Sequence, residues 1–209
     1  MIFNLDNQEK LINNTDCETE NNIVFWTKNI DILLAKWCDN AKCYEWMHTQ
    51  SYDFFNNKAK IFMITINILT TISGLSNIIV GGILINNFQI SWIFGSISII
   101  ASTLNIIQDK LAYNQISELH RKLVSDWLII RNKIEEILIL PPNSRKDCKT
   151  FLKYIKQDIN NATSQKNCII PQHIREECNK KFSIIENFDV PDICGQIEHT
   201  KTYNIEHLL

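Results

Sequence analysis

The middle of this 209-residue sequence lacks charge. Between Ile61 and Gln108 there is no Asp, Glu, Lys, Arg or His, although charged residues make up 21% of the chain. Helices that touch water normally carry charged side chains on their exposed face, so this run is not typical of a water-soluble domain. As one helix it would be roughly 70 Å long, more than twice the hydrocarbon core of a bilayer. The run therefore predicts two crossings.

The break between the two crossings is expected at Asn86–Gln89, where paired asparagines favour a tight turn. We therefore predict a transmembrane hairpin over residues 60–108, with spans at 60–85 and 88–108. Lys58, Lys60 and Lys110 flank the hairpin, and its turn has no charge. The positive-inside rule then places both termini in the cytoplasm.

Other scarce or missing features limit the possible fold classes, partners and cellular compartments. Glycine and proline are scarce, five and four residues, which favours an all-α protein. A net charge of -2 gives no general footprint for nucleic acid, and we expect none as a partner. The N-terminus lacks the basic and apolar regions of a secretory signal peptide. The seven cysteines all lie outside the hairpin, and because their number is odd we expect reduced thiols.

No motif of enzyme chemistry is present. The sequence has no phosphate loop, dinucleotide fingerprint, nucleophile elbow or zinc-binding helix motif, so we expect no enzyme, no catalytic residue, no cofactor and no metal. Cys38, Cys43 and His48 are spaced by five residues, which spreads them around a helix and argues against a zinc site. His120 lies on an apolar helix face, where a lone histidine is usually a hydrogen-bonded core residue.

Apolar residues recur every three or four positions on both sides of the hairpin, as in packed helices. This predicts a juxtamembrane helix at 22–59 and a cytosolic helical region at 109–182. Because both leave the same membrane face, we expect them to pair antiparallel. The seam between them should contain Trp26, Trp37, Tyr44, Tyr113, His120 and Trp127.

The ends of the chain have a weaker pattern. Residues 1–21 are polar and predict a mobile acidic arm. Pro141 and Pro142 should end a helix, after which Asn143 and Ser144 can cap the next. Residues 183–209 predict a loosely ordered tail.

Each predicted span carries small and polar residues on one helix face. Such a face either packs helices together, within the hairpin or between subunits, or lines a pore. We call these ten residues the polar stripe: Asn67, Thr70, Gly74, Asn77, Gly81, Ser91, Gly95, Ser98, Ser102 and Asn105.

The order of several segments resembles a known family. These are the Trp-rich helix at 37–52, ILTTISGLSN at 68–77, the second span, DKLAYNQISELHRK at 109–122, FLKYI at 151–155 and IIPQHI at 169–174. Together they resemble the SLATT domains, the SMODS- and SLOG-associating two-transmembrane effectors, and most of all members from large DNA viruses of eukaryotes. The resemblance covers residues 30–182. It implies a membrane effector that forms pores, and no catalytic residues.

The leading hypothesis is a two-pass protein of the lipid bilayer that homo-oligomerises and forms a pore. The alternative is a non-conducting scaffold, for example of a virion or host-cell membrane, that recruits a protein partner through its cytosolic helices. A third possibility is a soluble bundle that buries residues 61–108 as its core.

Overall fold

The computed structural model describes residues 25–79, 84–85, 88–89, 91–165 and 168–195. The predicted arm at 1–21 lies outside them. Apart from two short strands, the regular elements are helical, which confirms the all-α prediction. In order they are α2 (Lys28–Ile79), β1 (Leu84–Ile85), β2 (Phe88–Gln89), α3 (Ser91–Leu111), α4 (Tyr113–Ile139), η1 (Pro142–Ser144), α5 (Cys148–Thr163), α6 (Gln172–Phe182) and η2 (Asp192–Cys194).

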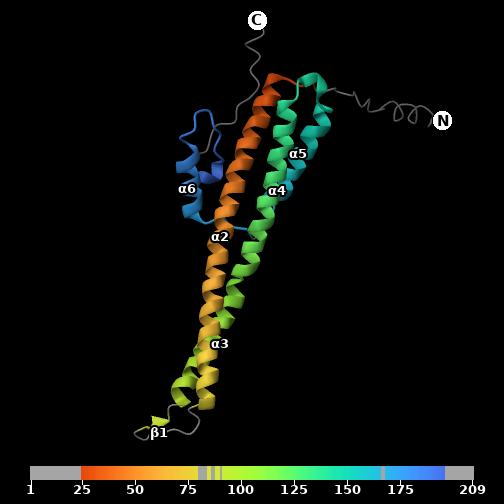
Figure 1. Ribbon diagram of the computed structural model, residues 1–209. Helices are drawn as coiled ribbons and strands as arrows, with labels where there is room; N and C mark the ends of the chain where they lie inside the picture. Colours follow the sequence, from red (N-terminus) through yellow and green to blue (C-terminus); the bar gives the residue numbers. More distant parts are fainter. Residues whose placement is uncertain (1–24, 80–83, 86–87, 90, 166–167, 196–209) are drawn as a thin grey trace, which may run out of the picture.

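The 52-residue helix α2 is the spine of the molecule. Figure 1 shows α3 beside its C-terminal half and α4 beside its N-terminal half, so that two shorter helices return along one long helix. The junction between α3 and α4 is Ala112, whose φ of 49° lies in the left-handed region that non-glycine residues seldom adopt. The sequence pattern gave no indication of this break.

The turn end of the hairpin differs from the prediction. α2 ends at Ile79 and α3 begins at Ser91, while β1 and β2 pair antiparallel with Leu84 opposite Gln89. The predicted spans 60–85 and 88–108 were therefore too long as helices at this end. Glycine lowers helix propensity, and Gly81-Gly82 follows α2 closely in the sequence.

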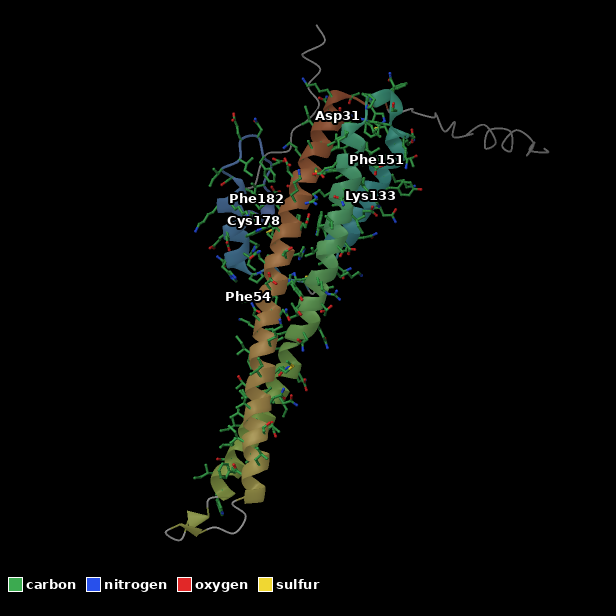
Figure 2. The ribbon with its side chains drawn as sticks, viewed as in Figure 1. Asp31, Phe54, Lys133, Phe151, Cys178 and Phe182 are labelled. Carbon is green, nitrogen blue, oxygen red and sulfur yellow. The ribbon has the colours of Figure 1, made fainter. Side chains whose placement is uncertain are left out.

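A tight apolar core holds α2, α4 and α5 together at the end away from the turn. Leu34 from α2 and Ile155 from α5 are buried with four large residues of α4: Leu123, Trp127, Ile130 and Ile134. Figure 2 shows Phe151 on α5 at this end. Because these side chains recur at helical spacing on each element, one face of each helix is removed from water.

A second core fixes α6 on the other side of α2. Cys43 and Met47 of α2 are buried with Cys178 of α6 and Cys194 of η2. Figure 2 shows Cys178 and Phe182 on α6 beside α2.

The segment after α6 packs against α6 and α2, although its sequence pattern is weak. Phe188 stacks on Phe182 at 5.3 Å between ring centroids, and Asp189 forms a 2.8 Å salt bridge with Lys36. Residues 183–195 of the predicted tail therefore contact α6 and α2, and residues 196–209 lie outside the described chain.

The predicted cap of α5 was also misplaced. Asn143 and Ser144 belong to η1, and the side chain of Asp147 accepts a 2.8 Å hydrogen bond from the Thr150 amide at the start of α5. Hydrogen bonds from the side chain and the amide of Thr150 lower the pKa of Asp147. Asn143, Ser144 and Asp147 are all residue types that can cap a helix. Asp147 is the cap because Asn143 and Ser144 are taken up by the preceding 3-10 helix.

The apolar stretch of α2 is not buried within the chain. Only 11% of its most apolar window is buried, and by length and composition α2 is the one helix of the described residues that could cross a membrane. A single chain therefore does not bury this stretch of α2 as a core.

Replacing Ile134 with alanine should destabilise the core by about 2–5 kcal/mol, because this side chain is fully buried and its loss leaves a cavity. Ile129→Ala is the matched control, since Ile129 is 50% exposed on the same helix, and it should change stability by less than about 0.5 kcal/mol. Denaturant unfolding followed by circular dichroism measures both. Equal effects would contradict the packing of α4 described above.

Candidate functional site

Two buried histidines, one on α2 and one on α4, face each other between these two helices. His48 of α2 and His120 of α4 are both buried, and their Nδ1 atoms lie 2.8 Å apart. The α2–α4 pairing brings them together, although 72 residues separate them in sequence. Both lie outside the charge-free stretch, on the side of the C-terminal helices.

A cysteine from a third element completes the cluster. Cys168 follows α5 and precedes α6, and its Sγ lies 3.2 Å from Nδ1 of His120. The ligand atoms of His48, His120 and Cys168 all lie within 4.8 Å of one another. We call this group the His–His–Cys cluster.

Burial keeps all three groups neutral at pH 7. Desolvation, with a smaller contribution from His120, lowers the pKa of His48 to about 3. Desolvation lowers the pKa of His120 to about 4 and raises that of the Cys168 thiol to about 12. Each imidazole therefore keeps an unprotonated ring nitrogen that can accept a proton or bind a cation.

Aromatic rings fix the orientation of both histidines. Phe55 stacks on His120 with 5.5 Å between centroids and an interplanar angle of 12°. Tyr44 lies over His48 at 6.3 Å and stacks on Trp127 at 4.5 Å. These contacts restrict the rings to a narrow range of positions, as a preorganised site requires.

A cavity of about 320 Å³ adjoins the cluster. His48 and Cys168 line it, together with Tyr44, Gln165 and Arg175 among others. A small molecule such as water therefore has room beside two of the three potential ligands.

Of the three residues in this cluster, the sequence pattern placed only one correctly. It placed His120 on the seam, but grouped His48 with Cys38 and Cys43. In the structure Sγ of Cys38 lies 3.7 Å from a carboxylate oxygen of Glu135, and Cys43 belongs to the second core, between α2 and α6. His48 is one helical turn after Tyr44, so helical phase could have placed it near the seam. Nothing in the sequence indicated that Cys168 would join them.

The predicted seam residues lie along the α2–α4 side of the molecule. Trp26 packs on Phe151 at 5.9 Å and donates a 2.9 Å hydrogen bond to the Lys146 carbonyl, and Tyr113 lies 5.9 Å from the Phe62 ring. Trp37 packs against the same core as Trp127.

Most described members of the polar stripe lie outside the contact between α2 and α3, although Ser98 is part of it. Gly95 and Ser98 are half-buried, whereas five members are exposed: Asn67, Thr70, Gly74, Ser102 and Asn105. The side chains of Asn77 and Ser91, and Gly81 as a whole, lie outside the described part.

The buried face of α2 is a different one. Ala59, Ile66 and Ser73, each seven residues apart, are buried against the returning helix. The Ser73 hydroxyl donates a 2.9 Å hydrogen bond to the Phe94 carbonyl and also contacts the Ser98 hydroxyl. The sequence pattern missed Ser73 because serine and threonine occur on several faces of this stretch.

Ser73→Ala should weaken the hairpin by about 1 kcal/mol, because a hydrogen bond between two helices typically contributes about this amount. Ser102→Ala removes the same hydroxyl from an exposed position of α3 and should leave the hairpin's stability unchanged. Unfolding in detergent–denaturant mixtures measures both variants. A larger effect at Ser102 would contradict the observed α2–α3 interface.

Comparisons with protein-family models, with curated proteins and with solved structures find no match to this chain.

Proposed function

We propose that the chain is a two-pass integral membrane protein that homo-oligomerises through its polar stripe and forms a pore. The observation that carries this proposal is the surface of the α2–α3 hairpin. It is charge-free from residue 61 to 108 and covered with exposed apolar side chains: Ile61, Met63, Ile64, Ile68, Ile72, Leu75, Ile93, Ile99, Ile100, Ile106 and Ile107.

A surface of this kind is unfavourable in water. Monomeric soluble proteins rarely expose contiguous apolar patches of more than a few hundred Å², and larger patches mark membrane or protein contacts. The exposed residues occur on both helices of the hairpin, so lipid accounts for them better than a single binding partner on one side. Beyond the hairpin, α4 instead buries an apolar face against α2 and α5.

The base of the hairpin has the residues of a membrane interface. The ammonium group of Lys58 lies 4.4 Å from the centroid of the Phe54 ring and 5.7 Å from that of Tyr113. Aromatic rings and lysines are favoured at the level of the lipid headgroups. At the other end, Trp92 is exposed near the start of α3. This arrangement supports a hairpin whose two termini share the cytoplasmic side.

The exposed part of the polar stripe supports self-association. Asn67 and Asn105 point away from the α2–α3 contact, and an amide in hydrocarbon needs a hydrogen-bond partner. Another copy of the chain, or water in a lumen between copies, can supply it. The resemblance to SLATT effectors favours the lumen.

The scaffold remains the second candidate. The cytosolic end carries two helices, α5 and α6, on different sides of the α2–α4 pair (Figure 1), and each presents an outer face. A protein partner could be recruited there without any conduction.

Gly74→Leu should reduce oligomer formation without unfolding the chain. A Cβ atom added at Gly74 meets no other atom within 4 Å, so a larger side chain fits the single chain but would separate two copies that meet at the stripe. Ile72→Phe enlarges an exposed residue on a different face of α2 and is the control. Light scattering in detergent measures the mass. Unchanged oligomers in Gly74→Leu would rule out the stripe as the subunit contact.

Liposome conductance separates the pore from the scaffold. Wild-type oligomers should leak ions, and replacing both Asn67 and Asn105 with leucine should lower conductance at least tenfold while oligomers persist, because an apolar lumen resists wetting. Ile64→Leu, an exposed apolar position, should conduct like the wild type. Correctly inserted wild-type oligomers that do not leak ions would contradict the pore and favour the non-conducting scaffold.

A further inference from the structure

We propose that His48, His120 and Cys168 bind a zinc ion that ties the segment between α5 and α6 to the α2–α4 pair. The proposal goes beyond membrane insertion and oligomerisation and does not depend on either.

The hydrogen-bonding capacity of the cluster is the first argument. Nδ1 of His120 lies within contact distance of both Nδ1 of His48 and Sγ of Cys168. One ring nitrogen offers either one proton or one lone pair, so it can make only one strong hydrogen bond of the two. A cation can be shared by all three atoms, and this explains why they converge.

The chemistry of the three groups selects the metal. Two imidazole nitrogens and one sulfur are the donor types that zinc prefers, whereas magnesium and calcium prefer oxygen. A cysteine in a reducing compartment is also available as a metal ligand instead of a disulfide partner. The six described cysteines, Cys168 included, are free.

The distances require little rearrangement. With metal–nitrogen bonds of about 2.05 Å and a metal–sulfur bond of about 2.3 Å, tetrahedral geometry separates two nitrogens by about 3.3 Å and nitrogen from sulfur by about 3.6 Å. The observed separations are 2.8 Å and 3.2 Å. His48 and Cys168, the third pair, lie within 4.8 Å of each other, and side-chain rotations can bring all three separations to the tetrahedral values. The metal displaces the Cys168 proton, which leaves to solvent.

The fourth position has a place in the structure. The cavity that His48 and Cys168 line can hold a water molecule as the remaining ligand. Arg175 lines the same cavity, and its positive charge favours hydroxide or another small anion there. The site therefore differs from closed structural zinc sites, in which four protein side chains surround the metal.

The location gives the metal a mechanical consequence. Its ligands come from α2, α4 and the segment at 168–170, three parts of the chain separated by at least 48 residues. Phe55, which stacks on His120, is only three residues before Lys58 at the proposed membrane interface. The ion would therefore fix the C-terminal helices next to the point where the hairpin enters the bilayer.

The test uses the full chain in detergent, stripped with a chelator and freed of any affinity tag. Titration with Zn²⁺ should give one ion per chain by mass spectrometry of the metal. Co²⁺ in its place should give tetrahedral absorption and a thiolate-to-cobalt charge-transfer band. His120→Gln and Cys168→Ser should each raise the Kd for Zn²⁺ more than about 100-fold. Mutating a residue that only hydrogen-bonds to a metal ligand already lowers metal affinity about 10–100-fold. The controls His173→Gln and Cys38→Ser should bind like the wild type.

Three results would overturn the proposal: less than one bound ion per chain, a cobalt spectrum without the charge-transfer band, or equal losses in the controls. The cobalt spectrum is recorded on the wild-type chain, so the proposal stays testable even if a variant fails to fold. Because oligomer mass and conductance are not measured, failure here leaves the proposed pore untouched.

Discussion

The packing of one unbroken helix, α2, against two returning helices is the interaction on which the rest of the structure depends. From Lys28 to Ile79 it contributes buried residues to both cores and forms the surface that contacts α3. Its N-terminal half buries a seam against α4, α5 and α6, and its C-terminal half exposes apolar residues around a narrow contact with α3. The same helix therefore joins a packed end to an end whose apolar side chains are exposed.

Helical periodicity made much of this fold predictable. The charge-free run indicated the hairpin, and the three-four spacing of Trp37, Tyr44, His120 and Trp127 indicated two helices with apolar faces. These features are local, because each depends on residues within a few turns of one another. The strands at 84–85 and 88–89 and the break at Ala112 were missed, since short strands and single left-handed residues leave little trace in hydrophobic spacing.

Contacts between distant residues were harder to predict. Ser73 and the polar stripe are equally plausible interface residues by type, and only the observed pairing of α2 with α3 shows that Ser73 faces Phe94 while Asn67 faces outwards. His48, His120 and Cys168 have no common spacing, so their convergence follows from tertiary packing. The position of residues 183–195 likewise depends on aromatic and ionic contacts with α6 and α2.

The central claim is that lipid covers the α2–α3 hairpin. Extraction of membranes with alkaline carbonate tests it most directly, because carbonate releases peripheral proteins and leaves integral ones in the bilayer. The chain should stay in the membrane pellet and leave it only with detergent. Release by carbonate alone, as a folded soluble protein, would show that other chains cover this apolar surface and would contradict the account.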